Sequence, residues 1–551
     1  MRVPPGVSSD DFSTALQQFE EAVGKEWVFT SDADVAMYRD AYSPFWGEPD
    51  ELVASAAVAP DNVEEVQKVV RIANTYKIPI YPVSTGKNLG YGGSAPVFSG
   101  SVVLDLKRMN RILEVDEKNA YALVEPGVSY FDLYRYIQEK GLNLWLDVPD
   151  PGWGSPVGNS LDRGGGYLMA QYRNHFDSHC GMEVVLPNGE LLRTGMGAMP
   201  GAKTWQQYKT GFGPWIDGIF SQSNFGVVTK MGFWLMPQPD AYLSGTVYVP
   251  RHDDLIPLVE IMTNLENTRV TNGMPDLGSL LLSIPMISEI AKWNQGEGPP
   301  PPDAELSALL AKSEGGGSPE LEQYALKKGI SYWSCKLSFY GPEKTNSANW
   351  EFAREKFSTI PGAKFEENES YKLPLTPEQR EKVHLPQFGI PSLAMFSIGA
   401  RSPVNPQPTN GHMWFSPIIP RTGEAIFEAN RVFAAAAKEF GLPVLSFSLP
   451  SCYWERAFIF IFAFPVTHDV ETNKKNRAAF KKVVQRAAEH GWGEYRTAPA
   501  YQDMIMGTYA YNNHALLRFH ETLKDAVDPN GILSAGRYGI WPKHLREGAK
   551  T

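Results

Sequence analysis

Residues 81–96 read YPVSTGKNLGYGGSAP, and this stretch carries four glycines, Gly86, Gly90, Gly92 and Gly93. Glycines spaced so closely let the backbone adopt positive φ and let several N–H groups converge on one anion. A loop with little positive charge of its own can therefore hold a pyrophosphate. The stretch predicts a site for a nucleotide cofactor.

The same glycines formally match the G-x-G-x-x-A fingerprint of a doubly wound dinucleotide site, from Gly90 to Ala95. That fingerprint requires a helix to begin at once, so that its N-terminus faces the phosphates. Here Pro96 and Gly100 follow instead, and the apolar run at 102–106 then reads as a strand. The context excludes a doubly wound site.

Helix and strand patterns alternate on both sides of the glycine loop. Upstream, Asp61 or Asn62 caps a helix whose apolar residues recur at helical spacing, and residues 77–83 read as a buried strand. The downstream patterns predict strands at 101–106, 112–115 and 121–125, a helix at 129–140, and a hairpin at 182–192 with Asn188-Gly189 at its tip. This alternation predicts an α+β fold.

A second glycine-dense region spans residues 152–166, where helix and strand signals are both weak. We expect a long loop wrapped around a bound group there. Beyond residue 240 helices alternate with strands again. That part is expected to hold a polar insert at 296–318, an aromatic strand at 410–418, helices at 424–440 and 472–491, a strand at 457–464 and a terminal helix at 513–527.

The length and the charge of the chain restrict what it can bind. With 551 residues, the chain exceeds the size at which a single hydrophobic core keeps growing, so two or more domains are expected. A formal net charge of -11 disfavours nucleic acid and anionic membranes as partners, because both repel a protein of this sign. Small molecules are the expected partners.

Cysteine usage and apolar runs indicate the compartment. The three cysteines, Cys180, Cys335 and Cys452, are scattered, which favours buried free thiols over disulfides or a metal cluster. The first residues lack the apolar core of a signal peptide, and no run approaches the roughly eighteen apolar residues of a membrane span. We expect a cytoplasmic protein.

Common catalytic motifs do not account for this chain. None of the ten histidines belongs to an H-E-x-x-H pair, and His175 and His179 lack a third ligand nearby, so no metal site is predicted. The G-x-S-x-G elbow and the Walker lysine motif do not occur either. Taken alone, His412, Tyr495 and Arg496 read as structural residues.

Seven motifs, taken together, change that interpretation. In chain order they are the glycine loop with Tyr91, the corner Pro149-Asp150, GNS at 158–160, SQSNFGVVT at 221–229, NGHMWFSPI at 410–418, GWGEYR at 491–496 and DPNGI at 528–532. The same motifs occur in the same order in the family of vanillyl-alcohol oxidase and eugenol oxidase, which are FAD-dependent 4-phenol oxidoreductases. The chain resembles this family from about residue 50 to its end.

The resemblance implies an FAD-binding domain of the vanillyl-alcohol oxidase type, made of two α+β subdomains. An α+β cap domain that carries the substrate pocket would interrupt it. The FAD-binding domain would comprise residues 1–238 and 491–551, and the cap domain residues 239–490. The resemblance also implies a homodimer or a larger homo-oligomer.

The resemblance further implies that FAD is the cofactor and that His412 is bonded to the 8α-methyl carbon of the flavin. Related p-cresol methylhydroxylases use a tyrosine for this bond, so a histidine favours the oxidases of the family. The family also carries an upstream histidine that assists attachment, whereas this chain has no histidine before His175 and has Tyr42 in that neighbourhood. The other implied cofactor contacts are Ser84, Gly86, Lys87, Asn88, Gly90, Gly92, Pro149, Gly158, Asn159, Ser160, Val228 and Arg537.

Family members bind the substrate as a phenolate, and the matching residues are Tyr91, Tyr495 and Arg496. A phenol titrates near pH 10, so ionising it at neutral pH costs about 4 kcal/mol. One charge-assisted bond and two hydroxyl bonds, at roughly 1.5–3 kcal/mol each, can supply this. Hydride transfer from the benzylic carbon to flavin N5 would then give a p-quinone methide. Asp150 matches the family aspartate beside these two atoms, and Tyr167 is implied in the substrate pocket.

The function that the resemblance implies is FAD-dependent oxidation of para-substituted phenols, with O2 reoxidising the flavin to give hydrogen peroxide. Candidate substrates are 4-alkylphenols, 4-allylphenols such as eugenol, and 4-hydroxybenzylic alcohols. The alternative is a methylhydroxylase-type dehydrogenase that passes electrons to a cytochrome c. A flavin-free binding protein and a sugar or lactone oxidase on the same fold are further alternatives.

Overall fold

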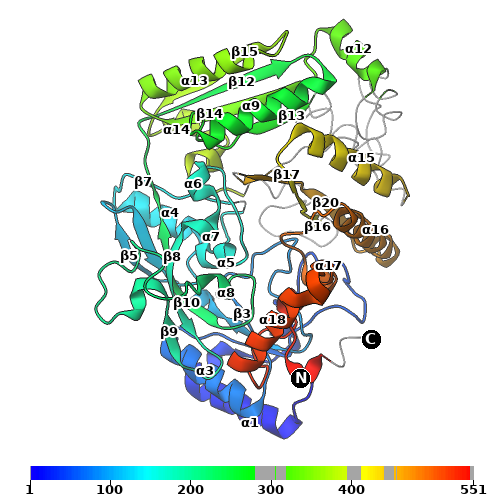
Figure 1. Ribbon diagram of the computed structural model, residues 1–551. Helices are drawn as coiled ribbons and strands as arrows, with labels where there is room; N and C mark the ends of the chain where they lie inside the picture. The colour runs from blue at the N-terminus through cyan, green and yellow to red at the C-terminus, as the bar shows by residue number, and fades with distance from the viewer. Residues whose placement is uncertain are drawn as a thin grey trace.

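The computed structural model describes residues 2–149, 151–279, 318–393, 411–439, 452–454 and 456–546, together with residues 305 and 309. Three larger sheets, of four, five and four strands, and three smaller ones organise these residues (Figure 1). Figure 1 shows the third sheet at the top of the molecule, with helices α1 and α3 at the bottom. No helix within the described ranges is long and apolar enough to cross a membrane.

The first sheet carries the glycine loop. Helix α3 (Val63–Tyr76) begins at Asn62, whose side chain accepts a hydrogen bond from the N–H of Glu65, as predicted. Its valines pack with helix α1 (Ser9–Val23) in one hydrophobic cluster. The strand order is β1 (Val28–Phe29), β2 (Ala56–Val58), β4 (Val102–Asp105) and β3 (Ile80–Val83). Strands β3 and β4 are parallel, so the glycine loop connects the end of one to the start of the other.

The C-terminal part of the chain returns to this sheet. The N–H of Ile80 in β3 donates to the carbonyl of Ile532 (2.7 Å), and the N–H of Ser534 donates to the carbonyl of Ile80 (2.8 Å). Ile532 and Leu533 are buried in the same cluster as α1 and α3. Residues 532–534 therefore lie beside the strand that leads into the glycine loop.

The second sheet is antiparallel, as the hairpin patterns predicted. Its order is β5 (Ile112–Asp116), β6 (Tyr121–Val124), β10 (Val227–Trp234), β8 (His179–Val185) and β9 (Leu191–Arg193). Helix α4 (Tyr130–Glu139) begins with a capping box between Ser129 and Asp132. Cys180 in β8 and Cys335 in the third sheet are buried free thiols, as expected.

The glycine-dense region at 152–166 is not entirely a loop, so that expectation was wrong in part. Helix α5 (Pro156–Leu161) lies within it. The Ser155 hydroxyl accepts hydrogen bonds from the N–H groups of Val157 and Gly158, and Pro156 occupies the first turn. Serine before proline is a helix-start signal that outweighs the low helix propensity of glycine and asparagine here.

The third sheet is antiparallel and is covered by helices α9 (Leu255–Asn267) and α13 (Glu343–Phe357) (Figure 1). Its order is β13 (Asp276–Ser279), β14 (Trp333–Gly341), β12 (Ala241–Val249) and β15 (Lys364–Lys372). Each of the segments predicted as one strand at 410–418 and 457–464 is split between two strands. These are β16 (Gly411–Phe415), β17 (Ile418–Pro420), β19 (Ala457–Ile459) and β20 (Phe462–Val466), and β16 pairs with β20 while β17 pairs with β19.

Helices α15 (Gly423–Glu439) and α16 (Val470–Glu489) lie where helices were predicted. They share one hydrophobic cluster with the third sheet and with Trp492 and Tyr501. The terminal helix α18 (Tyr511–Val527) starts with left-handed residues at 512–514. The predicted insert at 296–318 falls almost wholly outside the described residues.

Candidate active site

A cleft opens where the glycine loop, helix α5 and the C-terminal segment meet. Its empty volume is about 1070 Å³. The cleft is lined by eight of the residues predicted to contact the cofactor, namely Ser84, Gly86, Lys87, Asn88, Gly158, Asn159, Val228 and Arg537. Two glycine-rich segments and one arginine thus line the same cleft.

Two of these glycines permit the loops that form the cleft to pack closely. A Cβ added at Gly86, where φ is +66°, would lie 2.0 Å from Ser94 Oγ. A Cβ added at Gly158 would lie 2.2 Å from Ser84 Oγ. Neither position has room for a larger residue, so glycine is required at both. This polar, backbone-lined cradle fits a dinucleotide such as FAD.

Asp162 is an acidic residue of this cleft that the sequence interpretation missed. It is buried and accepts a hydrogen bond from Asn88 Nδ2 (2.5 Å). It also pairs with Arg537 (3.1 Å) and lies 3.8 Å from a terminal nitrogen of Arg496. The residue directly follows helix α5, and no local pattern in the sequence distinguishes it from an ordinary end of a helix. Asp162 therefore connects the cofactor cleft with the arginine of the predicted substrate site.

Tyr91, Tyr495 and Arg496 meet, as the resemblance implied. The Arg496 guanidinium carbon lies 3.7 Å from the centre of the Tyr91 ring and 5.7 Å from that of Tyr495. The Tyr91 hydroxyl lies 2.9 Å from Ser416 Oγ. Burial raises the pKa of Tyr91 even though Arg496 opposes the shift, so Tyr91 is a neutral hydrogen-bond donor at neutral pH.

Arg496 is a largely buried cation, whose side chain is 12% exposed. Burial alone would lower the pKa of its guanidinium, but Tyr495, Tyr91 and Asp162 together outweigh burial and raise it. Gln222 Nε2 donates to the Tyr495 carbonyl (2.8 Å), and Glu494 accepts a hydrogen bond from the N–H of Ser416 (2.5 Å). These bonds attach the segment that holds Arg496 to its neighbours.

His412 lies on β16 with its ring packed between aromatic side chains. Its ring centre is 4.2 Å from that of Trp414 and 5.0 Å from that of Tyr42. A Cβ added at Gly90 would lie 3.1 Å from His412 Cδ2, so the glycine loop touches the imidazole edge. Nδ1 of His412 is buried and has no hydrogen-bond partner among the described residues. Burial lowers the pKa of His412 to about 4, so the ring is neutral at physiological pH.

The remaining predicted residues lie elsewhere or are not described. Gly92 packs against Pro499, and the Ser160 hydroxyl donates to the carbonyl of His175. The Tyr167 ring lies 5.1 Å from that of His384, on the side of the third sheet. Pro149 is buried, and Asp150 falls outside the described residues.

Comparisons with known proteins show what this chain is similar to. Residues 54–195 match a family model described as an FAD binding domain. The chain is 34% identical over 541 residues to the flavoprotein subunit of 4-cresol dehydrogenase [hydroxylating] of Pseudomonas putida, covering 98% of this chain and 97% of the relative.

Two solved structures are similar over the whole chain. A 4-ethylphenol oxidase from Gulosibacter chungangensis, in an isoeugenol complex, is 35% identical with a TM-score of 0.81, covering 99% of this chain and 100% of that one. A substrate-bound p-cresol methylhydroxylase is 31% identical with a TM-score of 0.81, covering 98% and 99%. With these relatives and the α+β architecture described above, the chain is an FAD-binding oxidoreductase, and it belongs to the vanillyl-alcohol oxidase and p-cresol methylhydroxylase family of FAD-dependent 4-phenol oxidoreductases.

Proposed function

We propose that the protein oxidises para-substituted phenols, which it binds as phenolates through Tyr91, Tyr495 and Arg496. The observation that carries the proposal is the position of the Arg496 guanidinium within 3.7 Å of the Tyr91 ring and 5.7 Å of the Tyr495 ring. The relatives named for 4-cresol and 4-ethylphenol support it. The candidate substrates are 4-alkylphenols, 4-allylphenols and 4-hydroxybenzylic alcohols.

The charge balance of this trio suits a phenolate. Tyr91 is neutral and Arg496 carries its positive charge in a buried place, where a charge-assisted hydrogen bond is strong. Lowering the pKa of a phenol from about 10 to neutrality requires about 4 kcal/mol. One bond to the guanidinium and two to tyrosine hydroxyls, at roughly 1.5–3 kcal/mol each, cover this requirement.

FAD would lie in the cleft that the glycine loop and helix α5 line, where Lys87, Asn88 and Arg537 are among the polar residues of the wall. When bound, it supplies a two-electron acceptor. The neutral, buried imidazole of His412 touches the glycine loop and would form the covalent link to the 8α-methyl group. We also propose that residues 1–238 and 491–551 form the FAD-binding domain and 239–490 the cap, which the pairing of Ile532 with Ile80 supports.

The phenolate charge determines which bond of the substrate breaks. Tyr91, Tyr495 and Arg496 hold the ring oxygen as an anion, which raises electron density at the para carbon. The benzylic carbon can then lose a hydride, and a p-quinone methide remains. The resemblance implies that Asp150 acts beside this carbon, where a carboxylate would favour hydride loss and assist addition of water.

The final electron acceptor is proposed to be O2, with hydrogen peroxide as its product. His412 favours this choice, because histidyl attachment is the pattern of the family's oxidases. The test is to supply 4-propylguaiacol under air and measure hydrogen peroxide formed per phenol consumed. A ratio near one supports the oxidase, whereas a ratio near zero with fast turnover on a dye acceptor supports the dehydrogenase that uses a cytochrome c. Consumption of the O-methyl ether as fast as of the free phenol would contradict phenolate binding.

Covalent attachment of FAD should tolerate mild acid. A histidine with an ordinary pKa near 6.5 is about 90% protonated at pH 5.5 and cannot act as a nucleophile. His412, whose pKa is about 4, remains neutral there. We expect the fraction of bound FAD that becomes acid-stable to grow at pH 5.5 at more than half its rate at pH 7.5. A tenfold loss of rate would show that the imidazole titrates in its ordinary range.

We further propose that the protein forms a homodimer or larger homo-oligomer in the cytoplasm. The resemblance to the family, which implies such an assembly, supports this proposal. Light scattering during gel filtration would test the assembly, and a monomer at micromolar concentration would contradict it.

A further inference from the structure

Residues 38–51, which we call the strap, contain neither helix nor strand, yet their centre is buried. Tyr42 is 2% exposed and Ser43 5% exposed. The strap packs directly against β16, the strand that holds His412. A Cβ added at Gly411 would lie 2.4 Å from Cδ1 of Tyr42, and the Tyr42 ring centre is 5.0 Å from that of His412.

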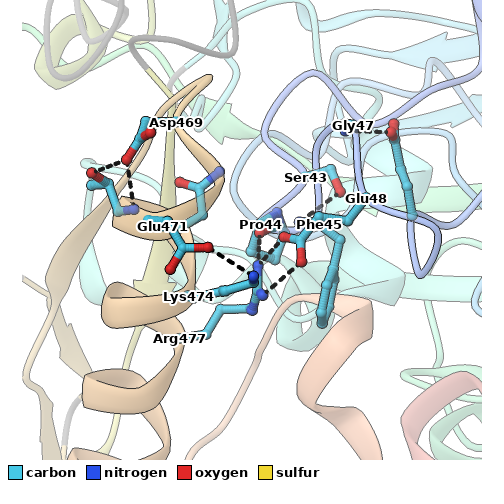
Figure 2. Close-up of polar contacts among 12 residues, drawn as sticks. Ser43, Pro44, Phe45, Gly47, Glu48, Asp469, Glu471, Lys474 and Arg477 are labelled. Atoms are coloured by element: carbon cyan, nitrogen blue, oxygen red, sulfur yellow. Dashed lines mark hydrogen bonds and ion pairs between the residues drawn. The ribbon is translucent and has the colours of Figure 1, made fainter.

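One arginine holds the strap against helix α16. Figure 2 shows Arg477 reaching from α16 to Glu48 and to the backbone of Pro44, beside the ring of Phe45. The guanidinium donates to both carboxylate oxygens of Glu48, at 2.7 and 3.1 Å, and also to the Pro44 carbonyl. It lies 4.3 Å over the Phe45 ring, and both partners of the ion pair are 11% exposed. A bidentate pair this sheltered from water is geometrically specific.

The strap is fixed at its ends as well. Arg39 donates to both carboxylate oxygens of Glu51 at 2.7 Å, and the N–H of Gly47 donates to Glu51 at 2.9 Å. Near its start, Asp40 lies against the glycine loop, 3.3 Å from where a Cβ on Gly93 would be. The strap therefore contacts the glycine loop, the His412 strand and helix α16 together.

The orientation of His412 depends on this packing. Histidines in functional sites are usually oriented by a hydrogen bond to one ring nitrogen. Nδ1 of His412 has no such partner within the described part of the chain. The ring is instead confined by Trp414 on one side and Tyr42 on another. An attacking nitrogen must approach its target atom to about 3–3.5 Å with the right alignment, so loss of one confining side would slow bond formation.

We propose that Tyr42 and Arg477 are positioning residues for covalent attachment of FAD at His412, with Arg477 acting through the strap. The inference rests on the proposed attachment at His412. The new C–N bond joins an imidazole nitrogen to the 8α-methyl carbon. Each partner loses one proton, two electrons remain on the isoalloxazine, and O2 accepts them to form hydrogen peroxide.

The test compares variants at two positions of helix α16, Arg477 and Lys474. Arg477→Met removes the contacts of Arg477 with Glu48 and Pro44. It is combined with Glu48→Gln so that no buried charge is left unpaired. Lys474→Met is the matched control, because Lys474 pairs with Glu471 on the exposed face of α16, where the two side chains are 51% and 79% exposed (Figure 2). After addition of FAD, acid precipitation separates attached flavin from released flavin.

We expect the double variant to bind FAD and to keep its melting temperature within a few degrees, but to acquire acid-stable flavin at least fivefold more slowly. Lys474→Met should match the wild-type protein, and Arg477→Lys should recover part of the rate. Attachment at the wild-type rate in the double variant would contradict the proposed role of Arg477.

Variants of Tyr42 test the same inference where the double variant does not fold. Tyr42→Phe keeps the ring and should attach FAD within twofold of the wild-type rate, whereas Tyr42→Ala should slow attachment at least fivefold. Attachment at the wild-type rate in Tyr42→Ala would overturn the role of the strap. His412→Ala separates the two proposals, because acid-stable flavin in that variant would refute the attachment point itself.

Discussion

Replacing Arg496 with methionine should lower kcat/KM for a 4-alkylphenol by at least about 10²-fold while FAD remains bound. The guanidinium is the largely buried cation beside Tyr91, and its charge-assisted bond supplies up to about 3 of the roughly 4 kcal/mol needed to ionise the substrate at neutral pH. Steady-state rates at pH 7.5 measure the loss. Because a phenol ionises in solution near pH 10, the deficit should shrink as the pH approaches that value.

A lysine at the same position provides the control. Arg496→Lys keeps the positive charge but not the planar fork, so we expect an intermediate loss of about 10- to 100-fold. Flavin content and melting temperature report whether the contact with Asp162, 3.8 Å away, matters for folding. An Arg496→Met enzyme within tenfold of wild type at pH 7.5 would contradict phenolate binding by this residue.

Replacing Glu266 with glutamine should reduce the free energy of unfolding by about 3–5 kcal/mol, which is large for one substitution. Glu266 lies on α9 and is 1% exposed, between Arg173 of the first half of the chain and Arg421. Each arginine pairs with a different carboxylate oxygen. The amide removes the negative charge that both buried guanidinium groups share.

Urea unfolding monitored by tryptophan fluorescence measures this effect. The matched control is Glu489→Gln, since Glu489 pairs with Arg486 on the surface, where their side chains are 46% and 42% exposed. An exposed pair of this kind contributes less than about 1 kcal/mol. A decrease below 1 kcal/mol in the free energy of unfolding of Glu266→Gln would contradict this prediction. It would mean that water reaches Arg173, Glu266 and Arg421, and that these three residues do not hold the third sheet to the rest of the molecule.

The first sheet and its loop could be predicted because their signals are local. Asn62 caps α3, and the short apolar strands on either side of the glycine loop are set by their own residues. Helix α5 was missed because glycine and asparagine have low helix propensity, although Ser155 and Pro156 carried a valid start signal. The return of Ile532 to β3 has no local signal, since it joins residues more than four hundred positions apart.

The proximity of the candidate site residues could be predicted to the extent that motifs carry it. The trio around Arg496 meets as the resemblance implied, and eight of the cofactor positions line one cleft. The sequence did not predict the roles of Asp162, Ser416 and the ion pair between Arg477 and Glu48. Their importance comes only from neighbours that folding brings together. The sequence shows Tyr42 only as the occupant of a region where the family has a histidine.

The ionisation state of a bound phenol tests the account most directly. 4-tert-Butylphenol has no hydrogen on its benzylic carbon, so it can bind but cannot lose a hydride. Its ultraviolet difference spectrum on mixing with the enzyme at pH 7.5 should show the red-shifted band of a phenolate, and the Arg496→Met variant should lack it. A bound spectrum of the neutral phenol in the wild-type enzyme would contradict the account.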